Sequence, residues 1–357
     1  MLVNRLLWKH HQWNKTVVAV SSKALFAQVT TNKPRWMSTV MSFGDGSQGA
    51  LGLPDSVTGP RGDAYEPTRV LGLPSDITSI SAGHYHSLAI DSRGGLWAWG
   101  RNLESQLEIL GMIQESGRLG HVNICAAFAS GVISAAIDSD GSVWVWGKSK
   151  RGQLGLGKGI IETVVPRRVE ALAGEKIVKV SFGWGHALAQ TEDGKLLGWG
   201  YSADGRIGNV GEALEASPLD SNASISMNDK RFSGSGLDAA ELMVLEGMEK
   251  EKDMPIIWEP RLVEELQGVE VRDIACGLDH SLVLCRNGTL FSSGSNVYGQ
   301  LGRTKLDLRL LPVDLTAHPV SIASGLGHSL AICEVPSSDV EGGGMSIFSW
   351  GGTNAPN

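Results

Sequence analysis

Short apolar runs, separated by polar turns, follow one another along most of this chain. Runs such as "HSLAI" from His86 and "VWVWG" from Val143 are too short for helices and are rich in residues that favour strands. Turn sequences with Asp, Asn or Gly, such as "DSRGG" and "RNGT", lie between them. The chain also holds 46 glycines, which suit tight turns. The pattern predicts an all-β fold of many short strands.

The runs recur in a fixed order with a period of about fifty residues. An aromatic run ends in a glycine corner at six places: Gly44, Gly100, Gly147, Gly200, Gly294 and Gly351. Four of the five intervals between corners measure 47 to 57 residues, and the interval of 94 residues holds an insertion. Each unit continues with a glycine loop, a short strand opened by proline, a "Gly-x-x-His" run and a turn. Four short strands per unit are typical of a β-propeller blade.

The unit "G-x-x-H-S-L-A-I…G-x-L-W-x-W-G…G-Q-L-G" resembles the repeat of the regulator of chromosome condensation family, whose members are seven-bladed β-propellers. The resemblance covers roughly residues 41–352 and implies a β-propeller of this type over residues 41–357. Five recognisable repeats of an expected seven indicate a chain shortened at its C-terminus, or a member that closes differently. The repeats lie at about 44–100, 100–147, 147–200, 200–294 and 294–351.

Two segments depart from the repeat. After Gly100 the sequence has Glu108 where glycine is expected and lacks the proline-led strand, so the second blade is altered. The acidic insertion at 209–257 begins with small polar residues that predict disorder. Its second half, "LDAAELMVLEGMEKEKD", has Asp238 and Glu241 in capping-box spacing and predicts a short amphipathic helix. This helix lies on the propeller or is offered to a partner.

Histidines and tryptophans repeat at fixed registers, and the resemblance implies structural roles for them. Each histidine belongs to its own repeat, so the four do not converge as metal ligands must, and no metal site is predicted. We expect each imidazole to hydrogen-bond backbone within its own blade and the tryptophans to pack between blades. The residues are His86, His186, His280 and His328, with Trp97, Trp99, Trp144, Trp146, Trp199 and Trp350.

Catalytic and cofactor motifs are missing from the sequence. The glycine loops lack the Lys-Ser/Thr pair of a P-loop, and there is no nucleophile elbow, paired catalytic acids or zinc-protease helix. We therefore predict no catalytic residue, no cofactor and no enzyme activity. No two cysteines have the two-residue spacing of a zinc or redox motif, so all four are expected to be reduced structural thiols. They are Cys125, Cys276, Cys285 and Cys333.

Two residues separate the glycine from the histidine in each "Gly-x-x-His" motif. The resemblance implies that these loop tips ring one face of the propeller and that partners dock there. The tips read His84–Tyr85, Trp184–Gly185, Leu278–Asp279 and Leu326–Gly327. His84, Tyr85, Trp184 and Asp279 are the candidates for partner binding. The alternative is that the aromatic side chains only fill their loops.

The first 40 residues have the composition of a leader. Residues 1–44 carry six basic side chains and no acidic one, and later turn rich in Ser and Thr, which is typical of an organellar transit peptide. "RWMS" from Arg35 resembles a mitochondrial processing site, so we expect the mitochondrial matrix; an ordered N-terminal helix or a tail is the alternative. The net charge of −7 makes the remaining chain acidic and argues against wrapping duplex DNA. No apolar run reaches eighteen residues, so no membrane span is predicted.

Three functions occur on this scaffold in the family. Guanine-nucleotide exchange uses acidic tips and an inserted β-wedge; Asp279 fits, but the other tips do not, and exchange is kept as the alternative. Ultraviolet-B sensing needs a tryptophan cluster and is rejected, because Trp184 stands alone. The overall pattern most resembles the plant mitochondrial members, which act in intron splicing and complex I biogenesis. We predict a non-catalytic mitochondrial scaffold that works through protein partners and reaches RNA only through them.

Overall fold

The computed structural model describes residues 16–20, 38–46, 48–54, 62–103, 107, 114–115, 122–211, 255–304, 307–335 and 344–352. The chain divides into two compact units, Met1–Ser134 and Ala135–Asn357, and each is described by itself. The altered position Glu108 and the helix expected at 237–253 lie outside the described residues. So does most of the leader, but Thr16–Val20 within it form a strand, β1, which pairs with β2.

The first unit contains two sheets and the first strand of a third. Its three-stranded sheet joins β1 to β2 in parallel and β2 to β3 antiparallel. Its four-stranded sheet is antiparallel in the order β4-β5-β6-β7. The strands are β1 Thr16–Val20, β2 Thr39–Gly44, β3 Ala64–Arg69, β4 Ile77–Ala82, β5 His86–Asp91, β6 Leu96–Gly100, β7 Gln114–Glu115 and β8 Ile124–Ala129.

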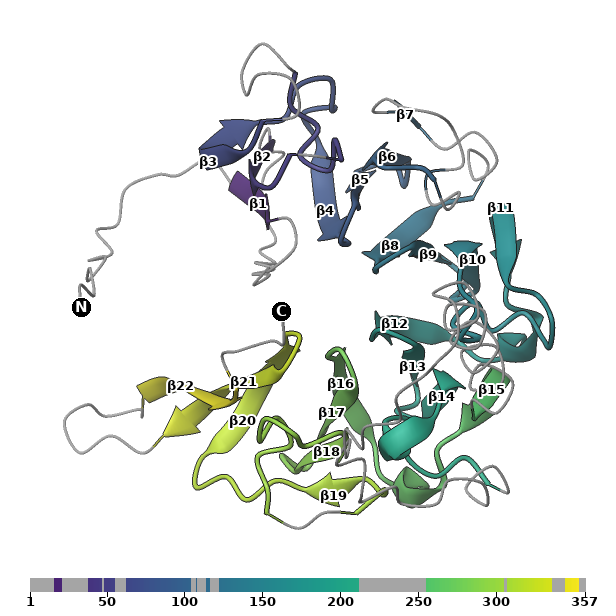
Figure 1. The fold of residues 1–357 in the computed structure, drawn as a ribbon, viewed down its shortest axis with the longest axis vertical. Helices are drawn as coiled ribbons and strands as arrows, with labels where there is room; N and C mark the ends of the chain where they lie inside the picture. Colours follow the sequence, from purple (N-terminus) through teal and green to yellow (C-terminus); the bar gives the residue numbers. More distant parts are fainter. Residues whose placement is uncertain are drawn as a thin grey trace, which may run out of the picture. The chain divides into compact units, whose positions relative to one another are not determined.

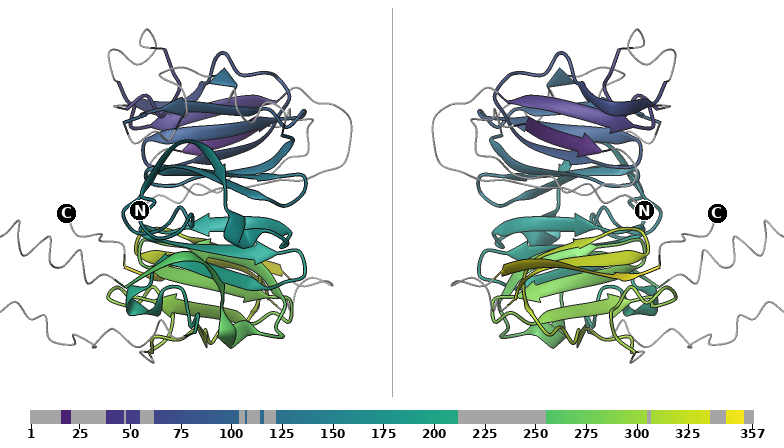
Figure 2. Two further views of the ribbon diagram at one scale, coloured as in Figure 1. Left: turned by 90° about the vertical axis from the view of Figure 1, so that its right-hand side faces the viewer. Right: turned by 90° about the vertical axis from the view of Figure 1, so that its left-hand side faces the viewer.

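The second unit continues the same antiparallel meander, as Figure 1 and the side views of Figure 2 show. The sheet orders are β11-β10-β9-β8, in which the division between units falls, then β12-β13-β14-β15, β16-β17-β18-β19 and β20-β21-β22. The strands are β9 Ile133–Asp138, β10 Val143–Lys148, β11 Glu162–Arg168, β12 Ile177–Phe182, β13 His186–Thr191, β14 Leu196–Tyr201, β15 Ile256–Leu262, β16 Val271–Cys276, β17 His280–Cys285, β18 Leu290–Gly294, β19 Leu311–Pro312, β20 His318–Ser324, β21 His328–Val335 and β22 Gly344–Gly351.

The prediction of an all-β propeller is confirmed. Each of the six sheets contains one of the six corner glycines. Where a sheet has a Gly-x-x-His motif, the corner glycine lies on the strand that follows this motif. The five repeats between successive corners therefore extend over six sheets. The helical segments in the described residues are short 3-10 turns. They span Glu170–Leu172, Ala203–Gly205 and Glu264–Leu266.

The corner glycine is required by both its backbone conformation and its contact. Gly200 has φ of 96°, and a Cβ there would lie 2.4 Å from the carbonyl oxygen of Gly185. The next residue, Tyr201, donates its backbone N–H to that same carbonyl at 2.8 Å. The third strand of the sheet thus contacts the Gly-x-x-His loop at the corner glycine, and no side chain fits at Gly200.

The expectation that proline opens the fourth strand is wrong. Pro166 is the fifth of seven residues in β11, and Pro260 holds the same place in β15. In β11 the register shifts between Val145 and Gly147 of the partner strand β10, so that a bulge contains Pro166. A proline on an outer strand is tolerated at a bulge, because the missing N–H is not needed by the ladder.

The altered second repeat has a reduced fourth strand. β7 is two residues long and pairs only Gln114 and Glu115 with β6, whereas β11 and β15 have seven residues each. The outer strand β19 is also two residues long although its repeat keeps the proline-led sequence "PVDL", so the length of this strand does not depend on the proline alone.

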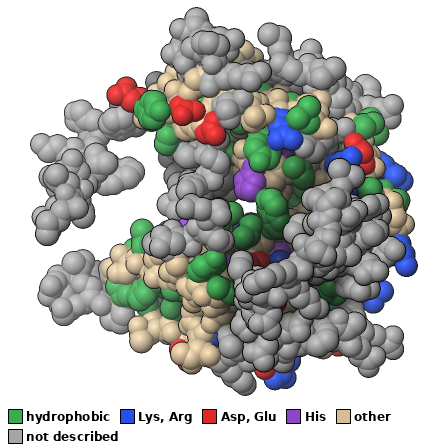
Figure 3. Space-filling view, viewed as in Figure 1, with side chains coloured by type: hydrophobic (Ala, Val, Ile, Leu, Met, Phe, Trp, Pro, Cys, Tyr) green, Lys and Arg blue, Asp and Glu red, His purple; other side chains and the backbone are tan. Residues whose placement is uncertain are grey.

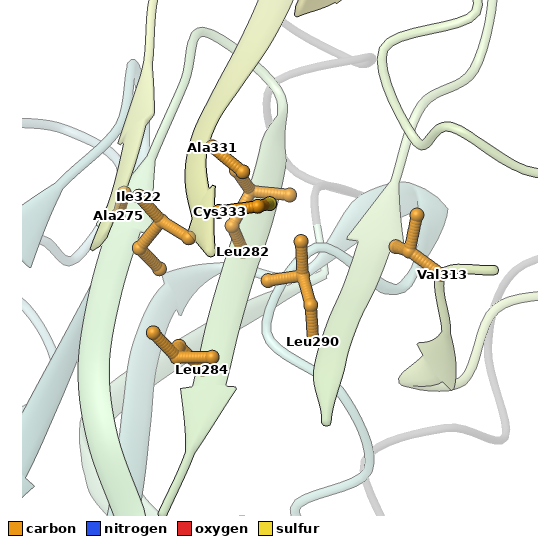
Figure 4. Packing of buried hydrophobic residues seen from close by; sticks show 8 residues of the cluster. All are labelled: Ala275, Leu282, Leu284, Leu290, Val313, Ile322, Ala331 and Cys333. Atoms are coloured by element: carbon orange, nitrogen blue, oxygen red, sulfur yellow. The ribbon is translucent and has the colours of Figure 1, made fainter. Parts of the chain in front are cut away.

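Apolar side chains fill the space between neighbouring sheets. Figure 4 shows one such cluster, in which Leu282, Leu284 and Leu290 of β17 and β18 face Ile322 and side chains of β21. The cluster is completed by Ala275, Val313, Ala331 and Cys333. Burying one leucine side chain stabilises the fold by about 1.5–3 kcal/mol, so this packing holds the sheets together.

All four cysteines are free, as predicted. Cys285 and Cys333 are buried, and burial raises the pKa of Cys276 and of Cys285 to about 11. Both thiols stay protonated at neutral pH. Cys285 acts as a small apolar side chain, whereas the Cys276 thiol donates to Ser181 O at 3.4 Å. Cys125 is exposed.

Candidate partner-binding surface

The loop tips and the residues beside them form what we call the tip surface. It comprises the two residues inside each Gly-x-x-His motif, the residue after each corner glycine, and the adjoining glycine loops. A backbone hydrogen bond joins the first two parts in each sheet that has the motif: Arg101 N–H to Tyr85 O, Tyr201 N–H to Gly185 O, Ser295 N–H to Asp279 O and Gly352 N–H to Gly327 O. Within each unit these loops therefore lie at the same edge of their sheets.

Aromatic rings and guanidinium groups alternate on the tip surface of the second unit. The Arg151 guanidinium lies 5.5 Å from the centre of the Trp184 ring and 5.7 Å from that of Tyr201. The Arg206 guanidinium also contacts Tyr201 and lies 4.8 Å from the centre of its ring. Cation–π contacts of this kind are worth about 0.5–1 kcal/mol each at exposed sites. Together they fix the position of Trp184, which remains 49% exposed.

Arg206 is anchored beneath this cluster. Its Nη2 lies 2.7 Å from the Asp204 carboxylate, and its Nε donates to the carbonyl oxygen of Ala203 at 2.8 Å. Arg206 is 5% exposed, and the neighbouring Asp204 has a positive φ of 59°. The buried, paired Arg206 guanidinium therefore restrains the Tyr201 ring that it contacts.

The first unit carries a smaller cluster of the same kind. The Arg101 guanidinium lies 4.7 Å from the Tyr85 ring centre, and the His84 ring meets the Tyr85 ring edge-on with centres 5.9 Å apart. His84 and Tyr85 are half-buried, and burial lowers the pKa of His84. The imidazole is therefore largely neutral at pH 7 and contacts Tyr85 as an aromatic ring.

Successive tips of the second unit are joined to one another. Trp184 donates its backbone N–H to Leu278 O at 2.9 Å, and Leu278 donates to Leu326 O at 3.1 Å. Asp279, the single acidic tip residue predicted, is half-buried, and Gln300 Nε2 lies 3.4 Å from its carboxylate. The tips thus form a hydrogen-bonded rim that holds Trp184 in place before any partner arrives.

The recurring histidines bond differently from what we expected. His186 Nε2 lies 2.9 Å from Ser281 Oγ, and His280 Nε2 lies 2.9 Å from Ser329 Oγ, so each partner is a side chain on the next sheet rather than backbone in the same blade. In the first unit His86 Nε2 lies 2.8 Å from Ser134 Oγ. The histidines therefore link sheets. His328 is only half-buried.

The serine hydrogen bonds define the protonation of these histidines. Ser281 Oγ donates to Arg206 O at 2.6 Å, and Ser329 Oγ donates to Gln300 O at 2.8 Å. Each serine oxygen must then accept from the imidazole, which places the proton on Nε2 and leaves Nδ1 of His186 and of His280 without a partner. Burial lowers the pKa of His280 to about 4 and that of His186 well below its ordinary value.

One position in the chain lacks both members of this pair. Ile133 begins its strand where the other second strands have histidine, and Ala187 stands in the next repeat where they have serine. Both side chains are fully buried. The polar histidine and the polar serine are thus replaced together, as expected if a buried donor needs its acceptor.

The tryptophans hold turns and glycine loops. The indole N–H of Trp199 donates to Gln153 O at 2.7 Å, and that of Trp350 donates to Gln300 O at 3.0 Å; Trp99 makes the same contact with Ala50 O. Trp97 and Trp144 instead donate to the aspartates of their own turns, Asp91 and Asp138. Trp146 is 1% exposed.

The sequence did not indicate the arginines of the tip surface, or Tyr201, on which two of them lie. Arg101 and Tyr201 directly follow a corner glycine, and Arg206 stands where two of the other glycine loops have Gln153 and Gln300. Aligning the position after each corner glycine would have singled out the first two. Among the described residues no group of three or more His, Cys, Asp or Glu is placed to hold a metal ion. Nor does that part of the chain contain a helix long and apolar enough to cross a membrane.

Comparisons with known proteins agree with this architecture. The model of the RCC1-like domain matches residues 39–355. The secretion-regulating guanine nucleotide exchange factor of Mus musculus is 28% identical over 322 residues, which cover 84% of this chain and 62% of that protein. The ultraviolet-B receptor UVR8 of Arabidopsis thaliana is 28% identical over 319 residues, which cover 82% and 58%. The chain therefore spans about three fifths of the length of both.

Two solved structures share the fold. The crystal structure of human WBSCR16 has a TM-score of 0.60 at 19% identity and covers 86% of this chain and 75% of that one. Prp20p from Saccharomyces cerevisiae has a TM-score of 0.60 at 22% identity and covers 82% and 63%. At these identities the likeness concerns the fold alone.

Proposed function

Since the chain belongs to the RCC1-like domain family, we propose that it is a non-catalytic propeller scaffold that binds protein partners through its tip surface. The observation that carries this proposal is the exposed Trp184, stacked on Arg151 and fixed to the rim through its backbone. Aromatic and arginine side chains are enriched among the residues that dominate protein interfaces. Loops on a rigid scaffold are also where binding function concentrates.

The preset position of Trp184 favours binding. Ordering a flexible side chain at an interface costs about 0.5–1.5 kcal/mol, and the contacts with Arg151 have already restricted this indole. Tyr85 is similarly restrained by Arg101 in the first unit. These features support anchors rather than side chains that merely fill their loops.

We place this scaffold in the mitochondrial matrix, where it supports intron splicing and complex I biogenesis. The support is the basic leader of residues 1–40 and the resemblance to plant mitochondrial members. Because the net charge is −7, tight direct RNA binding is disfavoured, and we infer that RNA is reached through protein partners.

The location is tested by import. A reporter fused to residues 1–44 is expected to enter the matrix and to be cleaved near Ser38, because the leader combines basic residues with no acid. Imaging and N-terminal sequencing measure both steps. Replacing the basic side chains of the leader with glutamine is the control and should abolish import. A reporter that stays in the cytosol contradicts the location.

Tip substitutions test the binding surface. Trp184→Ala and Tyr85→Ala should each weaken partner binding by about 2 kcal/mol, or about 30-fold, if they are interface anchors. Binding is measured by quantitative co-purification from mitochondria. Tyr65→Ala is the matched control: Tyr65 is 90% exposed, but it lies on the outer strand β3, which is not part of the tip surface. Equal binding by all three variants contradicts the proposal.

Guanine-nucleotide exchange on a small GTPase is the second candidate. Asp279 is a tip acid held near Gln300, and the Mus musculus relative is called a guanine nucleotide exchange factor. Exchange predicts that Asp279→Ala stops nucleotide release while partner binding by the Trp184 variant is intact. The scaffold proposal predicts that Asp279→Ala leaves nucleotide release unchanged and that the Trp184 variant loses partner binding.

A further inference from the structure

Arg151 reaches the tip of the next repeat because that tip has no side chain at Gly185. A Cβ at Gly185 would lie 2.7 Å from Cδ of Arg151 and 3.0 Å from Cβ of Tyr201. The place of Arg151, directly before the loop glycine, is taken by Tyr298 two repeats later, and Tyr298 likewise lies against Gly327. Glycine as the second tip residue therefore admits a large side chain from the preceding loop.

Trp184 and Arg151 present an apolar and a cationic group side by side. Trp184 is 49% exposed, and the Arg151 guanidinium lies over its ring, 5.5 Å from the ring centre. A guanidinium has five N–H donors in its plane, which a contact between its face and a ring does not use. A carboxylate accepts two such N–H groups at once, while an apolar side chain packs on an indole. The pair therefore fits a carboxylate that stands next to an apolar side chain.

The charge of the tip surface favours an acidic ligand. In the second unit this surface carries four basic side chains against two acidic ones, although the chain as a whole has a net charge of −7. Opposite potentials on two surfaces promote their association and exclude partners of the wrong charge. The charged residues are Lys148, Lys150, Arg151 and Arg206, with Asp204 and Asp279.

The positive charge is concentrated beside Trp184. Arg206 lies 2.7 Å from the Asp204 carboxylate. Lys148 lies 3.2 Å from the Glu162 carboxylate. Arg151 lies against aromatic rings instead, next to Lys150 in the chain. A strand of RNA suits this surface less well than an acidic peptide, because successive phosphates need a continuous row of cations.

We propose that the tip surface around Trp184 selects an acidic segment of a partner protein. A carboxylate of this segment binds Arg151, and a neighbouring apolar side chain packs on the Trp184 indole. This assignment rests on the proposed function and specifies the chemistry of its partner. The indole supplies affinity, and the charge pair supplies selectivity. Gly185 is a positioning residue, because it leaves the space through which Arg151 reaches Trp184.

The probe is a display library of short random peptides selected on the full chain. Peptides that also bind the Trp184→Ala variant are discarded. We expect the remaining peptides to be enriched in Asp and Glu beside an apolar residue, and the same selection on Arg151→Gln to lack this enrichment. One selected peptide is labelled with fluorescein and titrated by anisotropy. Arg151→Gln should weaken its binding by about tenfold or more.

A double-mutant cycle tests the charge pair. Changing the acids of the peptide to amides should weaken binding to the natural chain but not to Arg151→Gln, because the interaction is then already lost. Gly185→Ala should lower the affinity for the acidic peptide more than that for the amide peptide, because the new Cβ displaces Arg151. Circular dichroism checks that both variants fold. Losses that simply add in the cycle overturn the proposal.

Arg167→Gln is the matched control. Figure 3 shows Lys and Arg side chains at the edge of the second unit where β11 lies, and Arg167 is an exposed residue of that strand. This variant removes the same charge outside the tip surface, so peptide binding should stay unchanged. Equal losses in the Arg151 and Arg167 variants would mean that net charge alone attracts the peptide, and the proposal would fail.

The other outcomes separate this proposal from the proposed function. Peptides that need Trp184 but are not enriched in acids overturn the acidic partner and leave Trp184 as an anchor. A selection without any peptide that needs Trp184 contradicts both. Tighter binding of a fluorescein-labelled single-stranded RNA, lost in the same variants, assigns the site to RNA and overturns the proposal. So does a dimer, seen by sedimentation and lost in Arg151→Gln, because a second copy would then occupy the site.

Discussion

Gly200→Ala is expected to lower the free energy of unfolding by about 3 kcal/mol or more. Gly200 has φ of 96°, a conformation that costs an L-residue about 1–2 kcal/mol. The new Cβ would also lie 2.4 Å from Gly185 O, and such overpacking costs about another 1–3 kcal/mol. Relief would require the third strand to move away from the tip and to break the Tyr201 hydrogen bond. Urea denaturation measures the loss.

Gly159→Ala is the matched control. Gly159 has φ of 85°, but no atom lies within 4 Å of the Cβ that alanine would add. This variant therefore reports the backbone cost alone, about 1–2 kcal/mol. If the two variants lose the same stability, the close contact between the corner and the tip loop does not contribute.

The strands and the repeat were predictable because they depend on local sequence. An aromatic run before Gly147 or Gly200, a Gly-x-x-His motif and a turn each specify a short strand and its end without reference to the rest of the chain. The position of Pro166 was not predictable in the same way. A bulge is a property of two paired strands, and the shift between Val145 and Gly147 decides where proline falls.

The candidate site was predictable only in part for a related reason. Trp184 and Tyr85 stand inside a recognisable motif, so their place in a loop tip follows from the sequence. Arg151 belongs to a glycine loop of the preceding repeat, and its contact with Trp184 depends on how sheets pack. Likewise His186 bonds Ser281, 95 residues away, which no local pattern indicates.

Acidification is expected to destabilise the protein strongly between pH 7 and pH 5. Burial lowers the pKa of His86 to about 3 and of His280 to about 4, and it lowers the pKa of His186 as well. In the unfolded chain these histidines titrate near pH 6.5. Below that pH the unfolded chain binds more protons than the folded chain, so the free energy of unfolding falls as pH falls. Full stability is present above pH 6.5.

The expected size distinguishes these histidines from carboxylates. His86 and His280 each contribute a loss of about 2 kcal/mol between pH 7 and pH 5, which is about 4 kcal/mol together, and His186 adds to this loss. Asp91 takes up its proton at a lower pH than these histidines lose stability. Burial opposes its charge, but hydrogen bonds from the Trp97 indole and from the backbone N–H groups of Gly95 and Arg93 lower its pKa. Urea denaturation at pH 7, 6 and 5 gives the slope.

A double variant isolates one histidine. His186→Ile with Ser281→Ala copies the combination that the chain already has at Ile133 and Ala187, and it removes the buried donor together with its acceptor. Because one proton fewer is taken up on unfolding, the loss between pH 7 and pH 5 should shrink, by up to about 2 kcal/mol. An unchanged slope would mean that His186 binds a proton equally well in the folded and unfolded chains, and the buried neutral imidazole would be ruled out.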